Sequence, residues 1–181
     1  MKIIEFKTLS SQSIGKFHYS NHKTLNVKLL QKLNQIGWLR DSTSQNVKAG
    51  ITKSLLSYSS DNDIRELLNY IHSCLQFYIG NTAYHNSRNC NITDMWGVQY
   101  LKNESTHTHV HHPNTLAFVY FVQSTKKDAP LNFCDSFYKF YGQSGDLILF
   151  PAHLKHNVPK QKNKNIRTTI AGNVLYTGWY Y

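Results

Sequence analysis

With 181 residues, 40% of them hydrophobic and 13% aromatic, the chain suits one globular domain with a single core, and a disordered chain is excluded. The formal charge of +10 would suit a polyanion such as nucleic acid, but most basic residues are lysines scattered among asparagine and isoleucine, so nucleic acid is an alternative partner and not the favoured one. No apolar stretch is long enough to cross a bilayer, so no membrane partner is expected.

The N-terminal segment, residues 1–17, has too short an apolar run for a secretory signal and lacks a small-residue cleavage site. The three cysteines, Cys74, Cys90 and Cys134, are odd in number, far apart and in no CxxC pattern. Reduced thiols in a cytoplasm are therefore expected, rather than a disulfide framework.

The first part of the chain, residues 1–93, is predicted to be mainly helical. Apolar residues recur at helical spacing over 25–36, a segment that Gly37 ends. A stronger pattern covers 61–80, with Asp61 as the N-cap and Gly80 at the end. Both segments are expected to pack an apolar stripe against the rest of the protein.

The second part, residues 94–181, has the pattern of short strands, and no linker separates it as another domain. Alternating, β-branched or aromatic runs occupy 95–101, 116–124, 146–151 and 166–181. Several short strands that follow a few helices indicate a β-sandwich or a small barrel.

Four histidines lie close together in the stretch HTHVHHPNT, residues 107–115: His107, His109, His111 and His112. Side chains two residues apart share one face of an extended chain, so the first three should point one way and His112 the other. An HxH pair on one strand face can hold a metal ion through two imidazoles. Catalytic metal sites normally take three protein ligands, so a third must come from elsewhere.

The stretch GDLILFPAHLKHNVP, residues 145–159, offers His153 and His156 as candidates for the third ligand. Further on, Arg167 enters a strand of otherwise apolar character. A buried guanidinium needs a carboxylate, and no Asp or Glu follows Arg167 in the chain. A carboxylate from a small-molecule cosubstrate would fill that place.

These stretches resemble the Fe(II)/2-oxoglutarate-dependent oxygenases, in particular the short HxH-type members that marine cyanobacterial phages encode. The shared features are HVHHPNTLAFVYFV, PLNF, GDLILFPAHLKHNVP and IRTTIAGN, with Trp96 opening a strand and Tyr100 nine residues before His109. The resemblance covers residues 94–173, and the helical part matches only in general layout.

The resemblance implies a set of site residues. His109 and His111 match the proximal pair of metal ligands and His156 the distal one, and these three form the predicted catalytic centre. Arg167 matches the residue that binds the far carboxylate of 2-oxoglutarate, and Tyr100 and Asn173 are weaker matches to cofactor-binding positions. The wider family has an acid where this chain has His111, which leaves the metal more positive by about one charge and could admit Zn or Ni instead of Fe.

The implied fold is α+β but mainly β: a double-stranded β-helix, or jelly roll, with N-terminal helices packed on it. The implied activity is that of a dioxygenase that uses Fe(II), O2 and 2-oxoglutarate, hydroxylates a substrate and releases succinate. The alternatives are a three-His cupin-type dioxygenase without 2-oxoglutarate and a non-catalytic basic jelly roll that binds nucleic acid.

The substrate could be a peptide, a nucleobase or a small metabolite, and the oligomeric state stays open, a dimer included. A phage-encoded protein would act in the host cytoplasm.

Overall fold

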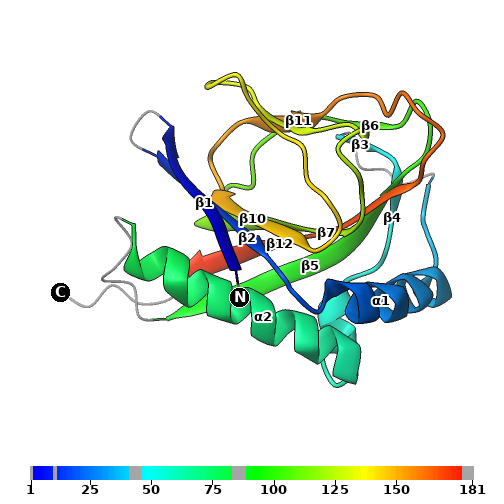
Figure 1. The fold of residues 1–181 in the computed structure, drawn as a ribbon, viewed down its shortest axis with the longest axis horizontal. Helices are drawn as coiled ribbons and strands as arrows, with labels where there is room; N and C mark the ends of the chain where they lie inside the picture. Colours follow the sequence, from blue (N-terminus) through cyan, green and yellow to red (C-terminus); the bar gives the residue numbers. More distant parts are fainter. Residues whose placement is uncertain (1, 10–11, 41–45, 83–88, 177–181) are drawn as a thin grey trace.

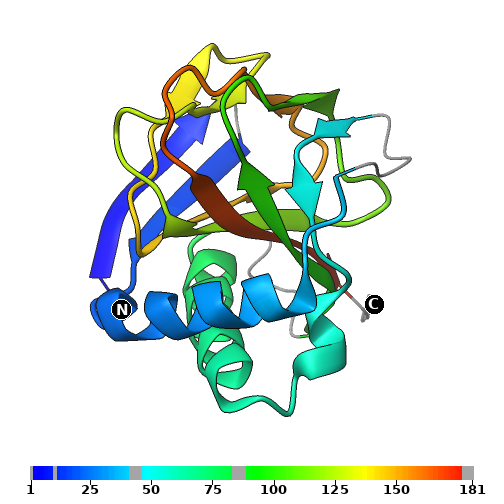
Figure 2. The same ribbon diagram turned by 90° about the vertical axis from the view of Figure 1, so that its right-hand side faces the viewer.

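Two antiparallel sheets and two helices make up the fold in the computed structural model, which describes residues 2–9, 12–40, 46–82 and 89–176. The sheets lie face to face, and the helices cover the outer face of the larger sheet (Figure 1). Figure 2 shows the same three layers from the side, with the large sheet in the middle. This is the jelly-roll architecture with packed N-terminal helices that the sequence predicts.

The larger sheet has seven strands in the order β1-β2-β10-β7-β12-β5-β4. Their bounds are Lys2–Leu9 (β1), Gln12–His18 (β2), Gly50–Ile51 (β4), Cys90–Tyr100 (β5), Leu116–Gln123 (β7), Asp146–Pro151 (β10) and Arg167–Tyr176 (β12). The smaller sheet has the order β3-β6-β11-β8-β9. Its strands are Val47–Lys48 (β3), Ser105–His109 (β6), Leu131–Phe133 (β8), Tyr138–Phe140 (β9) and His156–Val158 (β11).

The central strands β7 and β10 are almost entirely apolar because both of their faces are covered. On β7, Phe118 and Tyr120 belong to the core shared with the helices, whereas Val119 and Phe121 belong to the core between the sheets. Alternate side chains of one strand thus contribute to two hydrophobic cores, and the candidate site lies in the core between the sheets.

The helices lie close to their predicted positions. Helix α1 spans His22–Ile36, three residues longer at its start than predicted, and α2 spans Asn62–Gly80. The Asp61 side chain caps α2, as predicted, and accepts hydrogen bonds from the backbone N–H groups of Asp63 (3.0 Å) and Ile64 (3.3 Å). A short 3-10 turn, η1 (Leu55–Tyr58), precedes α2. In the described part of the chain, neither helix is long and apolar enough to cross a membrane.

The N-terminal part contributes strands that the sequence analysis did not predict. The hairpin β1–β2 extends the large sheet, and β2 pairs with β10 through Asp146↔His18 and Leu149↔Gly15. Strand β5 begins at Cys90, so Trp96 lies inside the strand rather than at its start. Residues 177–181 of the last predicted strand lie outside the described residues.

Candidate metal centre

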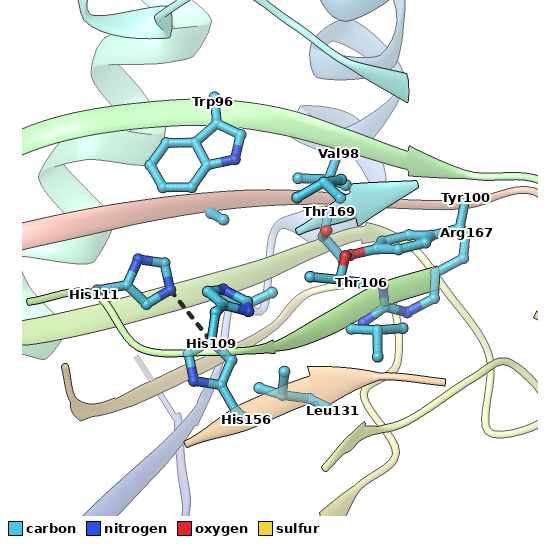
Figure 3. A pocket seen from close by; sticks show the side chains of 14 residues that line it. Trp96, Val98, Tyr100, Thr106, His109, His111, Leu131, His156, Arg167 and Thr169 are labelled. Carbon is cyan, nitrogen blue, oxygen red and sulfur yellow. Dashed lines mark hydrogen bonds between the residues drawn. The ribbon is translucent and has the colours of Figure 1, made fainter. Parts of the chain in front are cut away.

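Three histidines meet at one end of a pocket between the two sheets (Figure 3). His109 ends β6, His111 follows two residues later, and His156 begins β11 directly opposite His109 in the antiparallel pair. One ring nitrogen of each lies within 4.8 Å of the others, a grouping that could hold a metal ion. The predicted HxH pair and the predicted distal histidine are therefore together in space.

Hydrogen bonds set the tautomers of two of these rings. The Nδ1 atoms of His109 and His156 lie 2.8 Å from the backbone oxygens of His107 and Leu154, respectively. A carbonyl oxygen can only accept, so each Nδ1 carries the proton and each Nε2 keeps its lone pair for a metal. Metal-binding histidines usually have an outer partner of this kind.

The Nε2 atoms of His111 and His156 face each other at 3.2 Å. Two lone pairs at this distance repel unless a proton or a cation lies between them. Two nitrogens bound at right angles to one ion, each at about 2.1 Å, would lie about 3 Å apart. The arrangement is therefore close to that of two ligands on one metal ion.

Burial keeps two of the rings neutral. His156 is 3% exposed, and its burial, with the nearby His109, lowers its pKa to about 3. Burial and His109 lower the pKa of His111 to about 4, an effect that the amide of Asn173 partly offsets. Neutral imidazole is the form that binds metals, so both rings are ready to do so at neutral pH.

The other histidines of the sequence motifs stand apart from this group. His112 and His153 are exposed and do not line the pocket, so His156 and not His153 joins the HxH pair. The prediction that His107 shares the face of His109 is wrong. His156 pairs with His109 but Val158 pairs with Thr106, so β6 carries a β-bulge that breaks its alternation. Thr106 and His109 consequently both line the pocket, and His107 is exposed.

Arg167, on β12, lies at the opposite end of the same pocket (Figure 3). It is 1% exposed, and the rings of Tyr100 and Phe121 lie 4.8 and 5.2 Å from its guanidinium carbon. Its Nε and Nη1 atoms are buried and have no hydrogen-bond partner. Burial lowers its pKa, while Tyr100 and the more distant Asp128 raise it in part.

No carboxylate neutralises Arg167 within the described residues. Asp128 is the one acid that acts on it, and the Asp128 carboxylate is already occupied by Thr125 N–H (2.7 Å), Gln161 Nε2 (2.9 Å) and Asn163 Nδ2 (3.0 Å). A buried guanidinium without a counter-ion is costly, and an anionic ligand in the pocket would remove that cost. The donors present therefore fit a small carboxylic acid that reaches from Arg167 towards the histidines.

The pocket between these two ends has a volume of about 50 Å³, enough for a few water molecules. Tyr100 lies beside Arg167, and its hydroxyl is 2.7 Å from the hydroxyl of Thr106. Sequence reasoning missed Thr106 and several wall residues: Val47, Val98, Val119, Leu131, Val158, Thr169 and Ala171. Alternate side chains of β12 share one face, so counting in twos from Arg167 would have placed Thr169 and Ala171 in the pocket wall. The position of Thr106 in the wall could not be predicted in this way, because it depends on the bulge in β6.

Asn173, the weaker of the predicted cofactor-binding positions on β12, does not line the pocket that holds Arg167 and the histidines. It follows Thr169 and Ala171 on the same side of β12, beyond the pocket wall and next to His111. Its Oδ1 atom is buried and accepts no hydrogen bond of good geometry. Asn173 therefore lies next to a histidine of the triad and away from the end of the pocket that contains Arg167.

Comparisons with known proteins identify the fold. No protein-family model matches the sequence, and no curated protein is significantly similar to it. Solved structures are similar in three dimensions. A viral collagen prolyl hydroxylase from Paramecium Bursaria Chlorella virus-1, in a 2-oxoglutarate complex, aligns over 89% of this chain and 94% of its own with a TM-score of 0.69 and 10% identity. The fold is that of the 2-oxoglutarate/Fe(II) oxygenases.

Two further oxygenase-fold structures extend this likeness. HygX from Streptomyces hygroscopicus, with nickel and 2-oxoglutarate bound, aligns over 93% of this chain and 85% of its own, with a TM-score of 0.71 and 9% identity. A prolyl hydroxylase from Trichoplax adhaerens, in complex with a hypoxia inducible factor peptide, aligns over 90% of this chain and 83% of its own, with a TM-score of 0.64 and 16% identity. The oxygenase fold thus covers the helical part as well as the jelly roll.

Proposed function

We propose that the protein is a 2-oxoglutarate- and Fe(II)-dependent dioxygenase that hydroxylates an organic substrate. The observation that carries the proposal is the unpaired, buried guanidinium of Arg167 in the same pocket as the three converging histidines. A metal site alone would suit many reactions, whereas a metal site with a buried cationic anchor suits a metal-binding oxo acid with a second carboxylate.

In this proposal His109, His111 and His156 hold the metal ion, and Arg167 binds the far carboxylate of 2-oxoglutarate. When bound, the iron and the oxo acid supply the oxidising chemistry: one O2 yields a hydroxylated substrate, succinate and carbon dioxide. The hydroxyls of Tyr100 and Thr106, next to Arg167, are donors that can complete the carboxylate site.

The remaining residues exclude water and hold the donors in place. Apolar walls from Val98, Val119 and Leu131 lower the local dielectric constant, which strengthens the attraction between Arg167 and a carboxylate. Asn173 lies next to His111, whose ring has no backbone carbonyl partner among the described residues of the kind that orients His109 and His156. We assign to Asn173 the orientation of His111 and not the binding of the cosubstrate.

The all-histidine ligand set supports a second candidate, a three-His dioxygenase of the cupin type that needs no 2-oxoglutarate. Three neutral imidazoles leave the full charge on the metal, which favours a dianionic partner but also admits metals other than iron. In this alternative, Arg167 would bind a carboxylate of the substrate itself.

The test supplies Fe(II), ascorbate and 2-oxoglutarate and measures succinate, together with binding of 2-oxoglutarate by calorimetry. We expect binding and slow uncoupled turnover, both lost in Arg167→Gln. His156→Ala should lose metal, and His153→Ala is the matched control because it removes an exposed histidine three residues away. If 2-oxoglutarate neither binds nor turns over, the main proposal is wrong, and metal-dependent O2 consumption without it would favour the cupin-type alternative.

The substrate is best sought among peptides and small molecules. The similar structures include collagen and hypoxia inducible factor prolyl hydroxylases and HygX with hygromycin B bound. These are substrates or ligands of other proteins with at most 16% identity, so they guide a screen and do not select one compound.

A further inference from the structure

Four lysines surround a second hollow, on the opposite side of strand β8 from the metal pocket. We call it the basic hollow; its volume is about 360 Å³, and its charged and polar lining is Lys127, Asp128, Asn132, Lys139, Tyr141, Lys160 and Lys162. On β8, Leu131 lines the metal pocket and the next residue, Asn132, lines the basic hollow. Neighbouring residues of a strand point to opposite faces, so the two sites are separate.

The positive charge of the basic hollow is not balanced. Asp128 is the one carboxylate in its lining, is 4% exposed, and directs its oxygens to Thr125, Gln161 and Asn163. The ion pairs found among the described residues involve none of the four lysines. The β7–β8 connection, strand β9 and the β11–β12 connection thus present exposed lysine side chains around one hollow.

The loop that carries two of these lysines is held in place by buried hydrogen bonds. Gln161 is fully buried between the exposed Lys160 and Lys162, and its side chain bonds to Asp128 (2.9 Å) and to the backbone N–H of Ala129 (2.7 Å). Its backbone bonds to Glu104 and Asn103 at 2.9 and 2.7 Å. Because Gln161 is anchored from both sides, the backbone that carries the two exposed lysines is held in place, and little backbone ordering remains to be done when a ligand binds.

We propose that the basic hollow binds the phosphate backbone of a single-stranded nucleic acid. Four lysines without an ion pair among the described residues match a chain of phosphates. Tyr141, 46% exposed in the wall of the hollow, offers a face for base stacking. A concave site with an aromatic wall suits a flexible strand better than a rigid duplex. This proposal is independent of the oxygenase activity, because the metal pocket lies on the other side of β8.

The test measures fluorescence anisotropy of a labelled oligothymidylate of about 20 nucleotides, titrated with the full chain from low to moderate salt. A triple variant, Lys139→Gln, Lys160→Gln and Lys162→Gln, should bind at least about ten-fold more weakly. Its log–log salt slope should be shallower by about 2, since single strands release about 0.7 counterions per neutralised phosphate. Tyr141→Leu should weaken binding by about five-fold or more and leave the salt slope unchanged.

The matched control is Lys2→Gln, Lys23→Gln and Lys53→Gln, which removes the same charge from exposed lysines that do not line the hollow. This variant should bind the oligothymidylate less than about two-fold more weakly, and removal of metal with EDTA should leave the affinity unchanged. Equal losses in the two triple variants would mean that net charge alone attracts the strand, and the proposal would be wrong. Equal affinity for duplex DNA, or capture by phosphatidylserine vesicles without oligonucleotide binding, would also overturn it.

Discussion

At the scale of single residues, Arg167 is expected to lower the stability of the folded protein while it provides the binding site for 2-oxoglutarate. A buried guanidinium without a carboxylate destabilises the folded state, so Arg167→Met should stabilise the metal-free protein by about 1–3 kcal/mol. The same variant should lose all binding of 2-oxoglutarate. Urea unfolding and calorimetry measure the two effects, and Arg65→Met, on the exposed face of α2, is the control that should change neither. A less stable Arg167→Met protein would contradict this prediction and would show that the contacts of the guanidinium with the Tyr100 and Phe121 rings outweigh the cost of its burial.

The histidine triad should make the metal-free protein sensitive to acid. The folded pKa values of His111 (about 4) and His156 (about 3) lie below the ordinary value of 6.5. Above pH 6.5 the two histidines are neutral in both the folded and the unfolded chain, and their full contribution to stability is present. As the pH falls from 6.5 towards 4, the histidines of the unfolded chain bind protons that those of the folded chain do not. Each histidine then lowers the free energy of unfolding by at most about 1.4 kcal/mol per pH unit. Thermal melting in EDTA should show this fall, and His156→Gln should make it shallower; an unchanged slope would contradict the assignment.

At the scale of elements, Asp61 joins the two helices as well as capping one of them. Its side chain accepts the two N–H bonds at the start of α2 and pairs with Lys32 of α1 at 2.6 Å. Asp61→Ala should lower the free energy of unfolding by about 1 kcal/mol, because the cap is lost. Asp61→Asn keeps the cap and loses only a partly solvent-exposed ion pair, which contributes little. Urea unfolding of both variants separates the two roles, and equal losses would assign the effect to the ion pair.

At the scale of the whole molecule, the proposed ligands would connect the two sheets. The histidines belong to β6, β11 and the turn after β6, whereas Arg167 belongs to the large sheet. A metal ion alone should raise the melting temperature, and 2-oxoglutarate with the metal should raise it further; a ligand at about 100 times its Kd adds about 2.7 kcal/mol. Differential scanning fluorimetry with Ni²⁺ measures this, and Arg167→Gln should keep the first increment and lose the second. If Arg167→Gln kept both increments, Arg167 would not be the anchor.

Short-range chemistry in the chain was enough to predict much of this protein. Helix α2 follows from its apolar period and from Asp61, and the jelly roll follows from short apolar strands and the resemblance around His109. The choice of His156 over His153 came from the resemblance of the flanking residues, and the structure brings His156 and not His153 into the triad. These features depend on residues near one another in sequence or on a motif.

Other features arise from contacts between distant segments, which no local pattern contains. The bulge in β6 depends on pairing with β11 and turns His107 away from the pocket. Asp128 does not neutralise Arg167, because its carboxylate accepts hydrogen bonds from Gln161 and Asn163, which are distant from it in sequence. Lysines that look scattered along the sequence meet at one hollow because the β7–β8 connection, strand β9 and the β11–β12 connection converge there. Composition and spacing thus establish which chemical groups the protein has, whereas long-range pairing establishes which of them meet and which stay unpaired.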